Sequence, residues 1–195
     1  MLRPFLALLT LGATALSARA ATETFAFDPA HSSVAFSVRH FLAQVPGQFA
    51  RVSGRIDLDP ADFTRSTVTA TIDLASVWTQ ADKRDEHLRT ADFFDVAKYP
   101  AATFTSRSWQ KTGDDTYAVT GDFRLHGVTK ELTLAVKYLG RAQGNRGAVL
   151  TGWQTSLTLR RSDFGIGKPE RSIGDEVAVV INVEARLQPP EGQKP

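Results

Sequence analysis

Histidine and carboxylate side chains are the residues of this chain whose types could bind a metal or perform acid–base chemistry. The four histidines, His31, His40, His87 and His126, lie far apart in the sequence, and the chain has no cysteine. Without cysteine there is no thiol nucleophile, thiolate-bound zinc or iron–sulfur cluster. A metal site would need distant histidines and carboxylates to converge in the fold. We therefore predict no metal site and no catalytic residues.

Local motifs of catalysis or phosphate binding are also missing. The stretch Gly165-Ile166-Gly167-Lys168 lacks the earlier glycine and the following Ser or Thr of a P-loop, and the patterns G-x-S-x-G and H-E-x-x-H do not occur. Asp57 and Asp59 are two residues apart and share a strand face with Arg55, so we interpret them as solvent-facing rather than as a catalytic pair. The sequence therefore favours a protein that is not an enzyme.

The first 20 residues are typical of a cleavable signal peptide. They combine Arg3, an apolar stretch over residues 5–16 and the small-x-small pattern Ala18-Arg19-Ala20. The apolar stretch is shorter than the roughly 20 residues that a membrane-spanning helix needs. We therefore expect residues 1–20 to be removed and the mature protein to be periplasmic, without a stable membrane anchor.

Composition limits the partners of the mature chain. The 195 residues are 42% hydrophobic and 23% charged, which is typical of one globular domain. Without Arg3 and Arg19 the 23 basic residues become 21, equal to the 21 acidic residues. A neutral chain has no global field for a polyphosphate backbone or an anionic membrane surface. We predict no nucleic-acid partner.

Alternation of apolar and polar residues dominates the chain after residue 21, which predicts an all-β fold. Pro46-Gly47, Gly113-Asp114-Asp115 and His126-Gly127 are predicted turns. About eight strands are expected, over residues 33–40, 52–59, 68–74, 102–109, 116–125, 131–138, 149–159 and 177–187. Eight antiparallel strands in hairpin order can close as a barrel or form a sandwich. Strands of about ten residues favour the barrel.

Residues 81–100 interrupt the alternation and predict two short helical turns, with Asp82 and Thr90 as N-caps and Pro100 as a stop. Apolar residues lie on one side and charged residues on the other. We expect this segment to cover one mouth of the barrel.

The interior of an eight-stranded barrel is either filled by side chains or holds one small ligand. Small residues on the apolar faces, such as Gly54, Ala70 and Gly121, make incomplete filling conceivable. His40 continues the face of Phe36 and Val38, where it is either a core histidine or a polar group presented to a ligand. The sequence leaves both alternatives open.

Four ordered motifs resemble the YceI-like family. They are Phe27-Asp28-Pro29-Ala30-His31-Ser32-Ser33-Val34 with Val38-Arg39-His40-Phe41; Arg84-Asp85-Glu86-His87-Leu88-Arg89 with Asp92-Phe93-Phe94-Asp95 and Tyr99-Pro100; Gly121-Asp122-Phe123 with Leu125-His126-Gly127-Val128-Thr129; and Arg161-Ser162-Asp163-Phe164-Gly165-Ile166-Gly167 with Ile173-Gly174-Asp175-Glu176-Val177. The likeness covers residues 24–187. It implies a lipocalin-like antiparallel barrel, often exported, that binds a polyisoprenoid, an isoprenoid quinone or a fatty amide.

We therefore predict a periplasmic lipid-binding protein, with residues 1–20 as signal peptide, 21–187 as one barrel domain and 188–195 as a disordered tail. Its function would be carriage, storage or a stress response. A bound lipid is expected, but no cofactor. The predicted ligand-binding residues are Phe36, Val38, His40, Trp78, Leu88, Phe93, Phe94, Phe104, Phe123, Leu134, Tyr138, Trp153 and Leu157. Of these, His40, Trp78 or Tyr138 would meet a polar head group.

Two other functions remain open. One is an accessory partner of a membrane redox system in which the lipid is structural content, and the other is an unrecognised enzyme. Formation of a homodimer is also left open.

Overall fold

The computed structural model describes residues 22–189, which form one short α-helix, α1 (Asp82–Arg89), and eleven strands in a single antiparallel sheet. The strands are β1 (Glu23–Phe27), β2 (Ser33–His40), β3 (Ala43–Phe49), β4 (Val52–Leu58), β5 (Thr67–Asp73), β6 (Val77–Trp78), β7 (Ala101–Lys111), β8 (Thr116–Leu125), β9 (Val128–Gln143), β10 (Val149–Arg160) and β11 (Ile173–Leu187). Short 3-10 turns cover Phe63–Arg65, Leu74–Ser76, Asn145–Gly147 and Arg161–Phe164. The predicted signal peptide lies outside the described residues.

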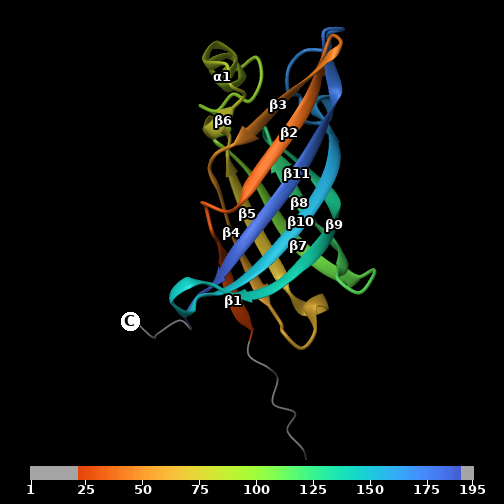
Figure 1. Cartoon of the computed structure of the whole chain (residues 1–195). Helices are drawn as coiled ribbons and strands as arrows, with labels where there is room; N and C mark the ends of the chain where they lie inside the picture. The colour runs from red at the N-terminus through yellow and green to blue at the C-terminus, as the bar shows by residue number, and fades with distance from the viewer. Residues whose placement is uncertain (1–21, 190–195) are drawn as a thin grey trace, which may run out of the picture.

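Eight strands close into a barrel in the order β1-β4-β5-β7-β8-β9-β10-β11, and β11 pairs back onto β1 (Figure 1). Closure depends on the 15-residue length of β11. Its C-terminal end pairs with β1 and its N-terminal part pairs with β2, so two consecutive short strands share one long neighbour. The predicted lipocalin-like barrel of about eight strands is confirmed.

The strands β2, β3 and β6 extend the sheet at the end of the barrel that carries α1, which is uppermost in Figure 1. The chain leaves the barrel after β6, forms α1 and a series of turns over residues 91–99, and re-enters at β7. One short helix was therefore correctly predicted, whereas the second helical turn is irregular. The predicted N-cap Asp82 is wrong, because Ala81 occupies the N-cap of α1. Thr90 is the C-cap of α1, and its hydroxyl also accepts the backbone N–H of Asp92 at 3.3 Å, as predicted for the cap of the following turn.

The predicted turn at Pro46-Gly47 is wrong, because the hairpin between β2 and β3 turns earlier in the chain. The chain reverses at Phe41 and Leu42, whereas Pro46 and Gly47 lie inside β3. Proline is tolerated there because β6 pairs only with Gln48 and Phe49, which leaves the backbone of Pro46 on an unpaired edge.

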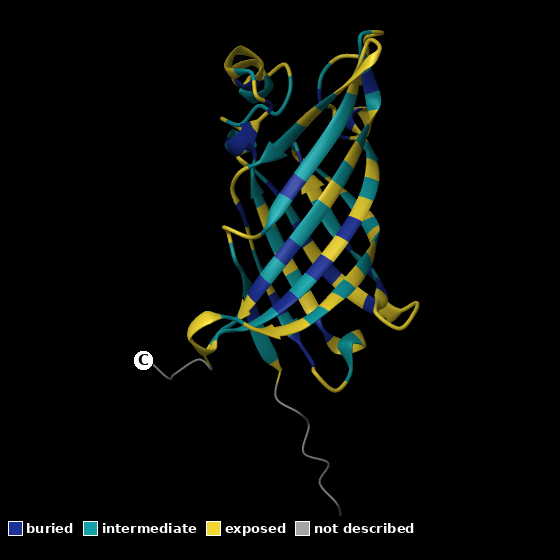
Figure 2. Ribbon diagram, viewed as in Figure 1, coloured by how far each residue is buried: buried dark blue, intermediate teal, exposed yellow. Residues whose placement is uncertain are grey.

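Side chains alternate between buried and exposed along the strands (Figure 2). Asp59 is an exception to the prediction, because it follows β4 and is buried, where its carboxylate accepts the backbone N–H groups of Ala61 and Asp62. Two apolar clusters fill the interior. One centres on Trp109, Tyr117 and Trp153 and the other on Leu125 and Phe164.

Two of the small residues expected to leave space are instead covered by aromatic rings. A Cβ on Gly121 would lie 2.3 Å from the Thr105 carbonyl oxygen and 2.8 Å from the Phe104 ring, and one on Gly54 would lie 2.5 Å from the Phe27 ring. These glycines allow close approach of a neighbour. The open interior therefore lies elsewhere.

No helix within residues 22–189 is long and apolar enough to cross a membrane. At the C-terminal end of that range the backbone N–H of Gln188 donates to the Thr24 carbonyl at 2.8 Å. Gln188, which was assigned to the disordered tail, is therefore attached to β1, and residues 190–195 lie outside the described part of the chain.

Candidate ligand cavity

A cavity of about 560 Å³ lies in the half of the barrel that carries α1. Ligand cavities of proteins commonly measure about 300–1,000 Å³. Strand β2 contributes Val34, Phe36 and Val38 to its wall. These residues share one face because side chains of a strand alternate between its faces. Val177 and Val179 of β11 pair with Val38 and Phe36 and continue the same wall.

A second, smaller cavity of about 130 Å³ lies deeper in the barrel. The two cavities share six lining residues, Val34, Ile72, Ala102, Phe123, Leu159 and Val179, and therefore adjoin one another. Phe123 packs edge-on against Phe164, with 5.5 Å between ring centroids, and stands at this boundary. Together the cavities form an apolar path from the α1 end toward the middle of the barrel.

A cluster of aromatic rings fills the far end of this path. Trp153 lies 5.6 Å from Trp109, 4.7 Å from Tyr138 and 5.9 Å from Phe63, between ring centroids. Burial raises the pKa of the Tyr138 hydroxyl above its ordinary value of 10.0. The path is therefore blocked by packed side chains at this end.

Two buried tryptophans in that cluster differ in their hydrogen bonding. The Trp153 indole N–H donates to the Thr151 hydroxyl at 3.1 Å, but the buried Trp109 indole nitrogen finds no acceptor among the described residues. An unpaired buried donor is unfavourable. Trp109 also lines the deeper cavity.

The segment after β6 forms one side of the cavity rim. Leu88, Phe93 and Phe94 line the cavity from this segment, and the His87 ring contacts Phe93 at 5.0 Å between centroids. The His87 imidazole lies 3.2 Å from the Asp92 carboxylate. His87 and Asp92 also line the cavity, so this segment gives it both apolar and polar side chains.

The position of α1 is fixed by polar contacts of Arg84, Asp85 and Arg89. The buried Asp85 carboxylate accepts the backbone N–H and the hydroxyl of Thr79, at 2.9 and 2.5 Å. Arg84 donates to the same hydroxyl at 2.7 Å, and Arg89 donates to the carbonyls of Ala75 and Val77 at 2.9 and 3.0 Å. These bonds hold the helix against β6.

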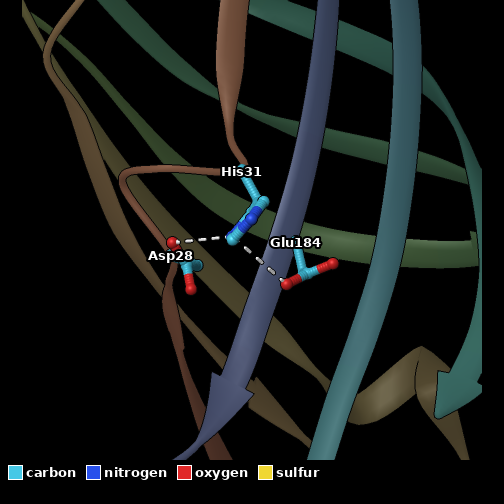
Figure 3. A group of neighbouring side chains, drawn as sticks. All are labelled: Asp28, His31 and Glu184. Carbon is cyan, nitrogen blue, oxygen red and sulfur yellow. Dashed lines mark ion pairs between the residues drawn. The ribbon is translucent and has the colours of Figure 1, made fainter. Parts of the chain in front are cut away.

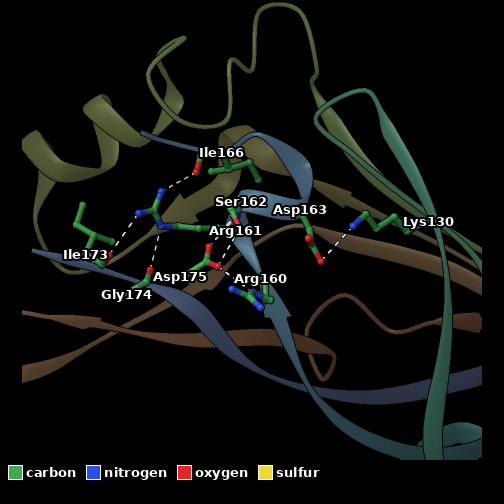
Figure 4. A network of polar contacts seen from close by, with 9 residues as sticks. All are labelled: Lys130, Arg160, Arg161, Ser162, Asp163, Ile166, Ile173, Gly174 and Asp175. Atoms are coloured by element: carbon green, nitrogen blue, oxygen red, sulfur yellow. Dashed lines mark hydrogen bonds and ion pairs between the residues drawn. The ribbon is translucent and has the colours of Figure 1, made fainter. Parts of the chain in front are cut away.

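The other side of the rim is held by Arg161, at the end of β10 (Figure 4). Its buried guanidinium donates to the carbonyls of Gly174 at 2.9 Å and Ile166 at 2.8 Å, and also reaches those of Lys168 and Ile173. Four backbone carbonyls thus surround one cation. The loop between β10 and β11 is fixed around this side chain.

Asp175, on β11, ties that strand to the end of β10 and the start of the same loop. Its carboxylate accepts the backbone N–H of Ser162 at 3.0 Å, the Ser162 hydroxyl at 2.8 Å and the Arg160 guanidinium at 2.9 Å. These donors, led by the Ser162 backbone N–H, hold the pKa of Asp175 at about 2.

Polar groups that line the cavity come from this rim. They include His40 at the end of β2 and Lys168, Glu170 and Ser172 in the loop before β11. Within residues 22–189 the Lys168 ammonium has no hydrogen-bond or ion-pair partner, and Glu170 accepts the Ser172 hydroxyl at 2.8 Å. An amphiphilic molecule would find apolar walls inside and polar groups at the rim.

The structure brings together most of the predicted ligand-binding residues. Phe36, Val38, His40, Leu88, Phe93, Phe94 and Phe123 line the large cavity. Phe104, Leu134, Trp153 and Leu157 line the deeper one, together with Phe123. His40 is exposed at the rim, which excludes its alternative interpretation as a core histidine.

Two predicted residues lie elsewhere. On the two-residue strand β6, Val77 pairs with Phe49 and is buried, so Trp78 faces outward and is 46% exposed. Tyr138 belongs to the aromatic cluster at the blocked end, far along the barrel from the rim. Neither residue is placed to meet a head group at the rim.

Sequence reasoning missed the rim residues Arg161, Lys168 and Glu170. Arg161 lies inside a motif of the resemblance, but its four acceptors become neighbours only when β10, β11 and their loop fold. In the sequence, Arg161 is simply an arginine that follows an alternating strand. Many surface arginines have the same position, so this pattern does not identify a buried one.

Asp28, His31 and Glu184 form a polar cluster outside the cavity, where β1 passes to β2 beside β11 (Figure 3). The His31 Nδ1 atom lies 3.2 Å from the Asp28 carboxylate and 3.6 Å from that of Glu184. Three ligand atoms within 4.8 Å have the types that a metal ion could use. However, the Asp28 carboxylate already accepts the Ala30 N–H at 2.9 Å. This hydrogen bond stabilises the turn between β1 and β2.

Comparison with known proteins agrees with this geometry. The model of the YceI-like domain family matches residues 25–185. A UPF0312 protein of Ectopseudomonas mendocina (strain ymp) is 34% identical over 191 residues, which are 96% of this chain and 100% of that protein.

Two solved structures share the barrel. The crystal structure of Burkholderia cenocepacia BcnA has a TM-score of 0.75 at 25% identity and covers 81% of this chain and 98% of its own. A polyisoprenoid binding domain from Saccharophagus degradans, implicated in plant cell wall breakdown, has a TM-score of 0.63 at 20% identity, over 84% of this chain and 98% of its own. Because the family model spans nearly all of the described residues, the chain belongs to the YceI-like domain family.

Proposed function

We propose that this protein is a periplasmic binding protein that holds one long apolar or amphiphilic molecule inside its barrel. The chemical classes that suit it are polyisoprenoids, isoprenoid quinones and fatty amides. It acts by binding, for carriage or storage, and the bound lipid is cargo rather than a resident cofactor.

The observation that carries the proposal is the cavity of about 560 Å³ with apolar walls and a polar rim. A fully packed barrel core would leave few voids larger than a water molecule. Apolar walls do not favour sugars or nucleotides, because the polar groups of these molecules would be buried without hydrogen-bond partners. The space therefore suits a hydrocarbon.

The free energy of burial is large enough for such a role. Burying one methylene contributes about 0.8 kcal/mol, so ten contribute on the order of 8 kcal/mol before the costs of association. An aqueous compartment offers a polyisoprenoid tail no comparable environment. A barrel that shields the tail from water would carry it between membranes or hold it in reserve.

The ligand would lie with its tail in the deeper cavity and its head at the rim. The aromatic cluster around Trp153 blocks the far end, which leaves only the rim for a polar group. His40 and Lys168 offer donors there. The Saccharophagus degradans neighbour, a polyisoprenoid binding domain, supports the same class of ligand through its fold.

The experiment introduces the same carboxylate at two adjacent positions of β2 that lie on opposite faces of the strand. Val38→Asp introduces a carboxylate into the cavity wall, whereas Ser37→Asp places one on the opposite face. Purified proteins are incubated with octaprenol in detergent, and retained octaprenol is measured by mass spectrometry. Val38→Asp should retain at least about tenfold less than the native protein, because an unpaired charge beside the tail is unfavourable.

Ser37→Asp should retain octaprenol at the native level. Equal retention by Val38→Asp and the native protein, with both folded by circular dichroism, would show that the cavity does not hold the lipid. The periplasmic part of the proposal is tested by intact-mass analysis of a periplasmic extract, which should contain a chain that begins near Ala21.

A further inference from the structure

The tip of the β2–β3 hairpin is the most exposed apolar feature among the described residues. Leu42 is fully exposed and the Phe41 side chain is 62% exposed. The tip is the orange end of the sheet at the upper right of Figure 1, and it is coloured as exposed in Figure 2. Two adjacent large apolar residues at a turn are unusual, because turns favour Gly, Asn, Asp and Ser.

The backbone of the tip makes these residue types more unexpected. His40 and Ala43 pair across the turn, which leaves a two-residue loop. Phe41 has a positive φ of 50°, in the left-handed region where such loops normally place glycine or asparagine. Folding alone would favour a small or polar residue here. Strained residues that persist often serve a function.

The tip is joined directly to the rim of the cavity. The Phe41 backbone N–H donates to the Ser172 carbonyl at 2.7 Å, and the Arg39 guanidinium donates to the Phe41 carbonyl at 2.9 Å. Ser172 and His40, which flank the tip, both line the cavity. The apolar tip therefore stands beside the opening through which a ligand would pass.

We propose that Phe41 and Leu42 insert into a lipid bilayer and bring the cavity rim to the membrane surface, so that ligand passes between bilayer and barrel. This inference rests on the proposed function. A loop tip with Phe and Leu has the chemistry of an interfacial anchor, since apolar side chains bury in the acyl boundary. Two side chains offer far less than the roughly 800 Å² per partner of a stable protein interface.

The anchor is short, and the contact it makes is transient. The mature chain is formally neutral if residues 1–20 are removed, so attraction to anionic lipids adds little. Binding should therefore depend on the two apolar side chains and change little with salt. The contact releases the protein again, as a carrier between membranes requires.

The test uses vesicles of phosphatidylcholine that contain octaprenol. The double variant Phe41→Asn and Leu42→Ser removes both apolar side chains, and asparagine tolerates the positive φ of position 41. The control is Leu139→Ser, which removes another large apolar side chain, 55% exposed, on β9 away from the rim. Two measurements are made on each protein: the fraction that sediments with vesicles, and the rate of octaprenol transfer into the barrel.

The tip variant should show at least about tenfold lower vesicle partition and transfer rate than the native protein. It should still reach native octaprenol content when the lipid is supplied in detergent, because the cavity wall is unchanged. Leu139→Ser should behave as the native protein, and partition should be similar between about 0.1 and 1 M salt.

Native transfer by the tip variant, or an equal loss in Leu139→Ser, would overturn the inference and leave the proposed function standing. Failure of the native protein to take up octaprenol even from detergent would instead overturn the proposed function. The two results are separated by the detergent measurement.

Discussion

Two tryptophan side chains in the barrel interior differ in their hydrogen bonding. Trp109 and Trp153 pack edge-on in the same cluster, but only the Trp153 indole N–H has an acceptor, the hydroxyl of the buried Thr151. Two tryptophans in contact therefore differ in whether their indole N–H group has an acceptor.

This contrast predicts different costs for one substitution. Trp153→Phe leaves the Thr151 hydroxyl unpaired, whereas Trp109→Phe removes a donor that has no partner. Both lose similar volume. Trp153→Phe should therefore lower the free energy of unfolding by about 1–3 kcal/mol more than Trp109→Phe. Urea unfolding of ligand-free proteins measures the difference, and equal losses would mean that the Trp109 N–H is satisfied in solution.

Residue-level patterns predicted the cavity wall better than its rim. Alternation along β2 gave the correct direction for Phe36 and Val38, because eight residues define a face. Trp78 was misplaced because a two-residue strand has no period of its own, and its direction depends on pairing with β3. Arg161 was missed because its acceptors are set by tertiary structure.

At the scale of elements, the loop from β10 to β11 carries the rim and is held at both ends. Arg161 holds it from inside through backbone carbonyls, and Asp175 holds it from outside through Ser162 and Arg160. A loop fixed in this way keeps Lys168 and Glu170 at the cavity.

The low pKa of Asp175 gives this contact a pH dependence. Its pKa is about 2 in the folded protein against an ordinary value of 3.8, so the ionised carboxylate stabilises the fold above about pH 4. That stabilisation is lost as the pH falls through this window toward 2. Asp175→Asn should therefore lower Tm at pH 7, and the difference from the native protein should shrink as pH falls from 4 to 2.

Thermal melts across this pH range provide the check. Asp163→Asn is the control, because Asp163 follows Ser162 in the turn after β10 but makes a single exposed ion pair with Lys130 at 3.1 Å. A Tm difference for Asp175→Asn that stays constant from pH 7 to pH 2 would contradict the assignment.

Element boundaries were predicted unevenly for physical reasons. The His126-Gly127 turn was recognised, and both residues have positive φ between β8 and β9. The β2–β3 turn was placed too late, at Pro46-Gly47, because Phe41 and Leu42 carry none of the usual turn chemistry. The tip that escaped prediction is the one to which we assign membrane contact.

At the scale of the whole molecule, closure of the barrel separates two kinds of interior. The aromatic cluster packs the end near β1, and the end near α1 contains the cavity. The barrel itself was predictable from alternation and hairpin order. The division into a packed and an open half was not, because it depends on which rings meet across the barrel.

The central claim is that the barrel holds a lipid, and native mass spectrometry tests it most directly. The protein is purified from periplasm without detergent and its mass is compared before and after denaturation. The account predicts an additional mass in the native state, released on denaturation and extracted into organic solvent as a polyisoprenoid, quinone or fatty amide. A native mass equal to that of the bare chain, in a protein that also fails to take up octaprenol, would contradict it.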